Sequence, residues 1–192
     1  PSHQFYAGDL EQRTYDPDKA RHHLKQAGHD SLDLSLSVSD VLYPGAIDGV
    51  TAFREQLAPI GINLEIVREP ADGYYSSVWM KKPWVASFWG ARPTEDLILS
   101  TAYLDGAPWN DSFFQHDRLN QLIVEARAEL DNAKRAEMYR EIQVILRDEG
   151  GTVIPLFANN VFAMSTKIGH PSEMSGSWEL DGGRLLDRWW MS

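Results

Sequence analysis

The feature that most constrains the fold is an alternation of two hydrophobic periods between residues 32 and 66. Apolar residues from Leu32 to Val38 alternate with polar ones, which predicts a half-buried strand. After Pro44-Gly45, apolar residues recur at helical spacing as far as Leu57, and strict alternation returns over 62–66. A strand, a helix and a strand in this order form a βαβ unit, which builds parallel sheets with right-handed crossovers. The sequence therefore predicts an α/β fold with a mostly parallel sheet.

Further elements are predicted on both sides of this unit. Asp16 and Pro17 are typical of a helix start, and Gly28 is typical of its left-handed end. Residues 84–89 are apolar on both faces, as buried parallel strands are, and are predicted to form a third strand. The remaining expected elements are a short helix over 72–80, a helix near 94–102, helices capped by Asp117 and Asp131, and extended segments over 153–157 and 161–164.

Composition excludes several classes of protein. Lys and Arg number 18 against 28 Asp and Glu, a formal charge of −10, which argues against a nucleic-acid-binding protein. No apolar run approaches the roughly 20 residues that a membrane-spanning helix needs. The absence of cysteine excludes disulfides, a thiol nucleophile and a Cys-based zinc site, and it fits an oxidising compartment.

The sequence contains few features that indicate a metal site or an enzyme active site. His22 and His23 point about 100° apart on a helix, the other histidines are scattered, and no metal site or cofactor is predicted. There is no GxSxG, P-loop or GxGxxG motif. Glu95 and Asp96 could form the carboxylate pair of a carbohydrate hydrolase. The preferred interpretation is that they follow Thr94 in a first helical turn, where negative charge meets free N–H groups.

The placement of the seven tryptophans points to a ligand site. Trp79 is expected in the core. Phe88, Trp89 and Gly90 end the predicted third strand, and ligands of open parallel sheets bind beyond the carboxyl ends of the strands. Trp89 is therefore predicted to offer an aromatic surface to a ligand. The alternative is that it packs under the following loop.

Arg92, two residues beyond Gly90, has two interpretations. Its planar guanidinium could clamp a ligand carboxylate through two hydrogen bonds. Equally, it could pair with Glu95 or Asp96 in the next turn of the chain.

Three segments are distinctive as a set: YDPDKARHHLKQAG (15–28), VTAFREQLAPIGINLEI (50–66) and HDRLNQLIVEARAELDNAKRAEMYREIQVILRDEGGTVIPLF (116–157). Together they resemble the periplasmic solute-binding proteins for oligopeptides, dipeptides and nickel. The resemblance implies one lobe of a type II periplasmic-binding-protein-like fold, α/β with a mostly parallel sheet flanked by helices. It also implies that residues 1–164 are the C-terminal lobe, and that 165–192 are a tail returning towards a missing N-terminal lobe.

The same resemblance implies a receptor of an ABC importer and no enzyme. Such a receptor is periplasmic or otherwise extracytoplasmic, captures a small peptide or other solute between two lobes, and delivers it to the permease subunits. Its contact with the membrane would be only through the permease or a lost anchor. The 192-residue chain would then be a fragment of a longer protein.

The resemblance also carries specific site residues. Trp89 matches the cleft tryptophan of the family's W-x-x-D segment, in which the Asp holds the α-ammonium of a peptide. Arg92 stands at the position of that Asp, which favours an anionic, opine-like solute over an ordinary peptide. Trp109 and Asn110 fall where family members carry cleft-facing loop residues, so they join the candidate ligand contacts.

Two other classes of protein stay open. One is the carbohydrate hydrolase that would use Glu95 beside tryptophans. The other is the effector-sensing domain of a regulator, although no helix-turn-helix is visible. On the receptor hypothesis, Trp178, Trp189 and Trp190 of the tail are expected to be exposed, because the missing lobe would cover them.

Overall fold

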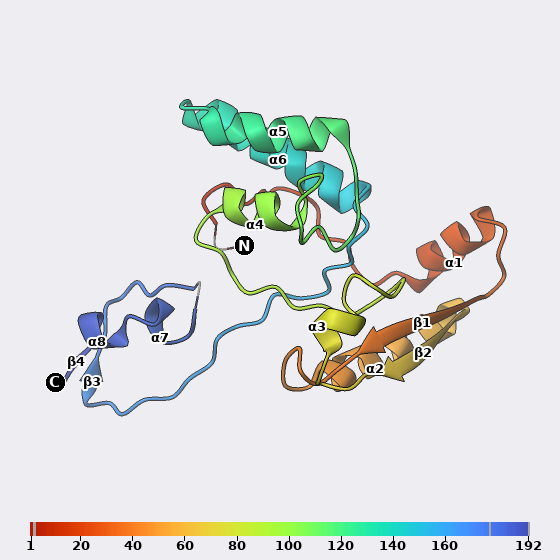
Figure 1. The fold of residues 1–192 in the computed structure, drawn as a ribbon, viewed down its shortest axis with the longest axis horizontal. Coiled ribbons are helices and arrows are strands. Elements are labelled where there is room, and N and C mark those ends of the chain that lie inside the picture. The colour runs from red at the N-terminus through yellow and green to blue at the C-terminus, as the bar shows by residue number, and fades with distance from the viewer. Residues whose placement is uncertain (2, 177, 192) are drawn as a thin grey trace. The chain divides into compact units, whose positions relative to one another are not determined.

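The computed structural model describes all residues except 2, 177 and 192. It divides into two compact units, whose helices and strands are labelled in Figure 1. The sheet unit is Glu11–Trp89, and the helical unit is Pro1–Leu10 together with Gly90–Ser192.

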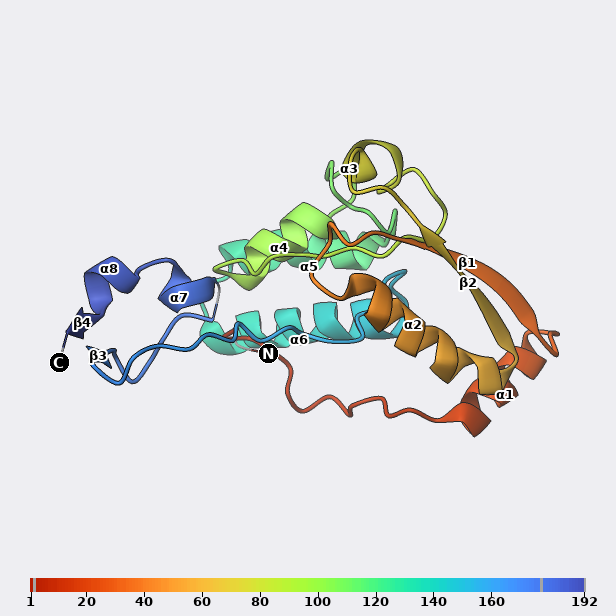
Figure 2. The same cartoon turned by 90° about the horizontal axis from the view of Figure 1, so that it is seen from below.

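The sheet unit contains the predicted βαβ arrangement. Strands β1 and β2 pair in parallel, from Leu32 opposite Ile62 to Val38 opposite Arg68, and α2 is the crossover between them. Figure 2 shows α2 lying along the two strands. The elements of this unit are α1 (Pro17–Gln26), β1 (Leu32–Val38), α2 (Ala46–Leu57), the 3₁₀ turn η1 (Ala58–Ile60), β2 (Ile62–Arg68) and α3 (Tyr74–Ser77).

Local signals set the ends of these elements as predicted. Asp16 Oδ1 accepts a hydrogen bond from Lys19 N at 2.9 Å, Pro17 is the first residue of α1, and Gly28 follows the helix with a φ of 84°. Gly61 turns the chain from η1 into β2 with a φ of 87°, and a Cβ there would lie 2.9 Å from Asp30 O. Only glycine fits that turn without strain.

The prediction of a third strand over residues 84–89 is wrong for most of that range. Ser37 N donates to Trp84 O at 3.1 Å and Ala86 N donates to Ser37 O at 2.8 Å, which gives a single parallel bridge at Val85. The hydroxyl of Tyr74 then donates to Ala86 O at 2.7 Å. That carbonyl is therefore bonded to a side chain, and the ladder stops before Phe88.

The helix predicted over 72–80 is also shorter than expected. It covers only Tyr74–Ser77, after Gly73 at a φ of 76°. Met80 has a φ of 58°, a left-handed conformation that no right-handed helix can include.

The core of the sheet unit lies between the strands, α2 and the region of α3. Trp79 and Trp84 are half-buried against this core, as predicted for Trp79. Its buried members are Leu36, Val38, Leu42, Ala46, Val50, Leu64, Tyr74 and Val78.

The helical unit is built on α4 (Glu95–Ala102), α5 (Asp117–Ala128) and α6 (Asn132–Asp148). Helix α5 packs on both α6 and α4 around a second apolar core, and α5 and α6 run side by side in Figure 1. The buried residues of this core are Leu99, Leu119, Leu122, Ile123, Ala126, Tyr139, Ile142 and Ile145.

The helix caps of this unit confirm one prediction and correct another. Asp131 Oδ1 accepts from the backbone N–H groups of Ala133 and Lys134, at 2.8 and 3.1 Å, as predicted. The cap of α5 is His116 rather than Asp117, because His116 Nδ1 accepts from Leu119 N at 3.1 Å. Asp117 is instead the first helical residue, where its charge faces free N–H groups.

Within the helical unit, the N-terminal segment packs on helix α6. The ring of Phe5 stacks on Tyr139 with centroids 5.3 Å apart. The Gln143 amide donates to Phe5 O at 2.8 Å and accepts from Ala7 N at 2.9 Å. These contacts join segments about 135 residues apart, which no local pattern predicts.

Residues beyond α6 have little regular structure. The predicted extended segments at 153–157 and 161–164 form no strand, and their apolar side chains are largely exposed, with Val161 at 91%. The short elements of the tail are β3 (Ile168–Gly169), α7 (Glu179–Gly182), α8 (Leu185–Arg188) and β4 (Trp190–Met191), and β3 pairs antiparallel with β4. Within the described residues, no helix has the length and apolar character to cross a bilayer.

Candidate functional site

The six predicted ligand contacts fall in both units. Phe88 and Trp89 are the last two residues of the sheet unit. Gly90, where the helical unit resumes, is followed there by Arg92, Trp109 and Asn110. Each group therefore has surroundings of its own.

Trp89 belongs to a group of aromatic rings in the sheet unit. Its half-buried ring lies edge-on to Trp79 with centroids 6.3 Å apart, and Trp79 lies edge-on to Tyr75 at 6.0 Å. Phe88 is 49% exposed, and its ring lies 6.4 Å from Tyr43. Edge-to-face contacts of this kind are favourable and hold the rings in defined orientations. Tyr43 and Tyr75 are additions that the strand pattern did not single out, because both precede the predicted strand.

Arg92 folds back on its own loop. Its Nη1 donates to Gly90 O at 2.8 Å, and its side chain is half-buried. The two carboxylates that could have paired with it have other bonds. Asp96 accepts two hydrogen bonds from Arg127 Nε, at 3.0 and 3.1 Å, and Glu95 Oε1 accepts from Phe5 N at 2.7 Å.

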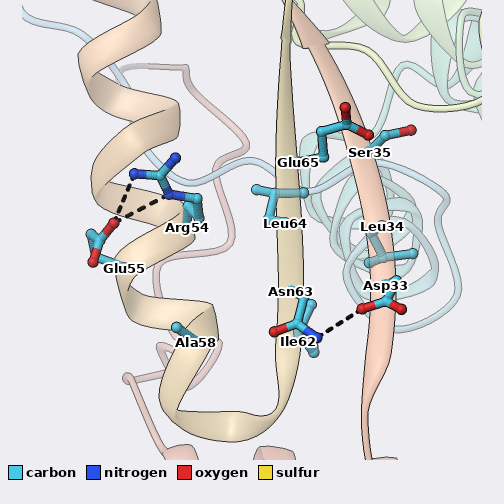
Figure 3. Close-up of a pocket in the computed structure, with 10 residues that line it drawn as sticks. All are labelled: Asp33, Leu34, Ser35, Arg54, Glu55, Ala58, Ile62, Asn63, Leu64 and Glu65. Atoms are coloured by element: carbon cyan, nitrogen blue, oxygen red, sulfur yellow. Dashed lines mark hydrogen bonds and ion pairs between the residues drawn. The ribbon is translucent and has the colours of Figure 1, made fainter.

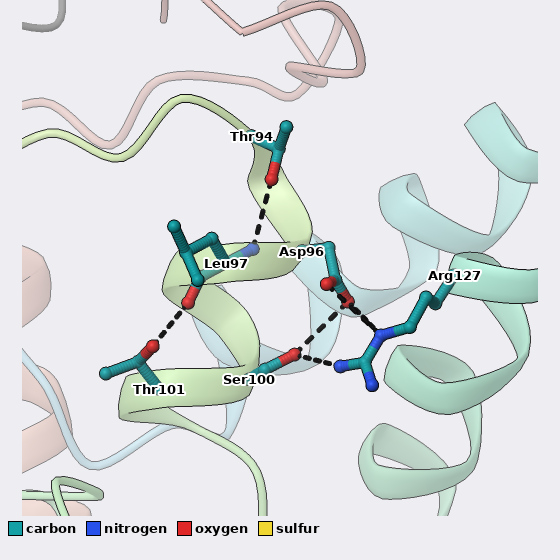
Figure 4. A network of polar contacts seen from close by, with 6 residues as sticks. All are labelled: Thr94, Asp96, Leu97, Ser100, Thr101 and Arg127. Atoms are coloured by element: carbon teal, nitrogen blue, oxygen red, sulfur yellow. Dashed lines mark hydrogen bonds and ion pairs between the residues drawn. The ribbon is translucent and has the colours of Figure 1, made fainter.

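Glu95 and Asp96 form the first turn of α4, as the preferred interpretation predicted. Thr94 Oγ1 caps the helix by accepting from Leu97 N at 3.3 Å. Arg127 also donates to Ser100, whose hydroxyl donates to Asp96 at 3.1 Å, so these side chains join α4 to α5 (Figure 4). The geometry of this carboxylate pair is that of a helix start and an interhelical ion pair.

Trp109 and Asn110 are neighbours with opposite environments. Trp109 is 50% exposed, whereas Asn110 is 6% exposed. The Asn110 amide donates to Phe114 O at 2.9 Å and its Oδ1 accepts from the Ser112 hydroxyl at 3.1 Å. Asn110 thus holds the loop together and presents its neighbour Trp109 at the surface, while its predicted role as a ligand contact stays a prediction.

A hollow of about 580 Å³ lies elsewhere in the sheet unit, between α2 and the starts of the strands. Figure 3 shows its Arg54–Glu55 ion pair, at 2.9 Å, and the Asn63 amide donating to Asp33 at 2.7 Å. None of the predicted ligand contacts lines it. The residues that do are Asp33, Leu34, Ser35, Arg54, Glu55, Ala58, Ile62, Asn63, Leu64 and Glu65.

Two titratable groups at the carboxyl end of the strands have shifted pKa values. Burial, and then the charge of Glu69, raises the pKa of Tyr74 to about 12. Hydrogen bonds from Lys82 and from the Ser37 hydroxyl, the latter at 2.8 Å, lower the pKa of Glu69. Among the described residues, no group of three or more His, Cys, Asp or Glu side chains is arranged to hold a metal ion.

Comparison with known structures defines the class of the fold. The chain is similar to the ABC transporter-associated periplasmic binding protein DppA from Helicobacter pylori, solved with the peptide STSA, with a TM-score of 0.67 and 23% identity over 79% of this chain. It is also similar to NikZ from Campylobacter jejuni, solved with Ni(L-His), with a TM-score of 0.68 and 17% identity over 77% of this chain. The fold is therefore that of one lobe of a periplasmic-binding-protein-like protein.

Sequence comparison agrees with the structural one. The chain is 27% identical over 169 residues to the dipeptide-binding protein of Escherichia coli K12, over 80% of this chain. No family model matches the sequence. The resemblance to the solute-binding proteins of peptide and nickel ABC importers is thus confirmed. The chain spans about 30% of the length of the dipeptide-binding protein and of DppA, and 33% of NikZ.

Proposed function

We propose that this chain is the C-terminal lobe of an extracytoplasmic solute-binding receptor of an ABC importer. The observation that supports it best is the similarity to the dipeptide-binding protein along most of the chain, together with the shared fold. The related structures hold a peptide or a nickel complex, and DppA is a periplasmic binding protein associated with an ABC transporter. In this proposal the chain binds a solute and catalyses no reaction. Glu95 and Asp96 then have a structural role at the start of α4, where Asp96 also pairs with Arg127 of α5.

The proposed mechanism is closure of two lobes over the solute. Ligand contacts made by both lobes stabilise the closed form, so binding shifts the population towards it. The permease subunits would receive the solute from that form. The partners are therefore a complementary N-terminal lobe, the solute and the permease, and the location is the periplasm or another extracytoplasmic space.

The proposed ligand is a small anionic solute. Arg92 stands where the resembling peptide receptors carry an Asp, so a cationic ammonium would meet a guanidinium rather than a carboxylate. A guanidinium binds carboxylates through two parallel hydrogen bonds, which are among the stronger polar contacts in proteins. Phe88, Trp89, Gly90 and Trp109 would supply apolar and close-approach contacts, and Asn110 would hold the Trp109 loop.

Calorimetry with Arg92→Ala tests this assignment. An opine-type dicarboxylate is titrated into the 192-residue chain and into a longer form that supplies the complementary lobe. We expect tighter binding to the longer form, because the lobe alone offers only part of the contacts. Arg92→Ala should weaken binding by about 1.5–3 kcal/mol, the scale of hydrogen bonds to charged groups.

A matched control is Arg54→Ala, which removes an arginine that pairs with Glu55 on α2 and lines a hollow that none of the candidate residues lines. It should leave the affinity unchanged. Equal affinity of the wild type and Arg92→Ala for the dicarboxylate would contradict the assignment of Arg92. Preference for an uncharged dipeptide amide over the dicarboxylate would contradict the anionic ligand class.

A further inference from the structure

A tryptophan of the tail lies beside two of the candidate ligand contacts within the helical unit. A Cβ placed on Gly90 would be 3.6 Å from Arg92 Nη1, and 3.7 and 3.8 Å from the Cζ3 and Cη2 atoms of Trp178. The guanidinium and the indole ring therefore both lie on the side of Gly90 where a side chain would project. An alanine at this position would touch both groups at ordinary van der Waals distance, so Gly90 brings its backbone close to the guanidinium and the indole.

The turn that carries Trp178 is held by an ion pair between Arg188 and the buried carboxylate of Asp181. Asp181 is 1% exposed, and its Oδ1 accepts from Ser175 N at 2.7 Å and from Arg188 Nη1 at 2.8 Å. Arg188 Nη2 donates to Glu173 O at 2.9 Å. The backbone of Trp178 is part of the same turn, since its carbonyl accepts from Gly182 N at 3.2 Å.

The same turn is strained, yet it leaves its tryptophan in solvent. Leu180 and Asp181 have φ values of 50° and 62°, in the left-handed region that residues with a side chain rarely adopt. Trp178 is 57% exposed. Strained backbone that a buried network holds in place is characteristic of functional segments, and a positioned aromatic side chain offers a large contact area.

We propose that Trp178 and Arg92 form one subsite beside Gly90, for a carboxylate that carries a neighbouring aromatic ring. Arg92 binds the carboxylate, and the aromatic ring stacks on the indole of Trp178. The inference rests on the proposed function, and it adds a contact from the tail and a substrate class, which is acids with an aromatic ring near the carboxylate rather than aliphatic acids. Trp178 is then a specificity-determining residue.

Three small probes separate the two halves of this subsite. N-benzoylglycine has a carboxylate and a ring, N-acetylglycine has the carboxylate only, and N-benzoylglycine amide has the ring only. Titrated by calorimetry or NMR into the 192-residue chain, N-benzoylglycine should bind at least tenfold more tightly than either of the others. With Trp178→Ala, N-benzoylglycine should bind no more tightly than N-acetylglycine. With Trp178→Phe, most of the difference in affinity between the two acids should remain.

The matched control is Trp190→Ala, since Trp190 lies in the same tail and is 54% exposed. It should change no affinity, and thermal unfolding of each variant checks that the chain stays folded. If Trp178→Ala and Trp190→Ala behave alike while Arg92→Gln weakens both acids, the inference is wrong and the proposed anionic site stands. If N-benzoylglycine binds no better than its amide, both the subsite and the proposed ligand class fail.

Discussion

The cores of the two units are built differently. In the sheet unit, buried polar groups lie among the apolar ones: Ser37 and Ser39 are 5% and 1% exposed, and the Tyr74 hydroxyl bonds to Ala86 O. In the helical unit, the buried core around Leu122 and Ile142 is aliphatic apart from Tyr139, and the buried polar residues Asn110 and Asp181 lie outside this core, in the Trp109 loop and in the tail.

The difference follows from where backbone hydrogen bonds are made. The helices α5 and α6 satisfy their backbone groups internally, so their contact needs only apolar side chains. A short parallel sheet ends in unpaired N–H and C=O groups, and side chains must bond to them where they are buried. Stability should therefore depend on packing volume in the helical unit and on individual hydrogen bonds at the end of the sheet.

The largest expected effect tests the aliphatic core. Ile142 is 0% exposed, so Ile142→Ala leaves a cavity and should lower the free energy of unfolding by about 2–5 kcal/mol. Chemical denaturation followed by circular dichroism measures the loss. Leu130→Ala is the control, because Leu130 is 89% exposed and its truncation should cost less than about 0.5 kcal/mol. Similar losses for the two variants would contradict the packing argument.

A smaller loss of stability is expected when the hydrogen bonds between α6 and the N-terminal segment are removed. Gln143→Leu removes both amide bonds to Phe5 and Ala7 and should cost about 1–3 kcal/mol, because it leaves two backbone groups without partners. Limited proteolysis should also cut the first ten residues faster. Gln121→Leu is the control, since the Gln121 amide donates to the exposed Glu125 side chain on its own helix. An N-terminal segment equally protected in both variants would refute this account.

The smallest effect concerns the polar end of the sheet. Tyr74→Phe removes the hydroxyl that bonds to Ala86 O and should cost about 1 kcal/mol at neutral pH. Because the pKa of Tyr74 is raised from 10.0 to about 12, its neutral form stabilises the folded state. That contribution is complete below pH 10 and is lost as the pH rises towards 12.

Denaturation between pH 8 and pH 12 measures this contribution. The wild type should lose stability above pH 10 more steeply than Tyr74→Phe. Tyr75→Phe is the control, because the Tyr75 ring is 49% exposed. Tyr75→Phe should lose stability above pH 10 as steeply as the wild type does. If the wild type and Tyr74→Phe lose stability equally between pH 8 and pH 12, Tyr74 is not the source of the loss.

Most regular elements could be predicted because their signals are local. The alternation over 32–38 and 62–66 and the caps at Asp16, Thr94 and Asp131 depend on residues a few positions apart. The predicted third strand extended too far because an apolar run does not reveal where a side chain such as Tyr74 interrupts the ladder. His116 was missed as a cap because aspartate, which follows it, is the commoner capping residue.

In the predicted ligand site, too, the sequence identified candidate residues but not their surroundings. The sequence singled out Trp89 and Trp109 as aromatic candidates, and the structure gives them half-buried and exposed surroundings respectively. The three tryptophans of the tail differ in their exposure to solvent. Trp178 and Trp190 are exposed as expected, whereas Trp189 is half-buried, with its ring 5.5 Å from Phe162. Nothing in the local pattern distinguishes these three residues.

By itself, the sequence determined the βαβ unit, the helix pair and the resemblance to peptide and nickel receptors, because periodicity, caps and motifs are properties of neighbouring residues. Only the tertiary structure decided which residues from distant segments meet. It placed Phe5 against Tyr139, Asp96 against Arg127, and Trp178 beside Gly90 and Arg92. These contacts depend on the packing of whole elements, since the chain segments that they join are separated by 31 residues or more.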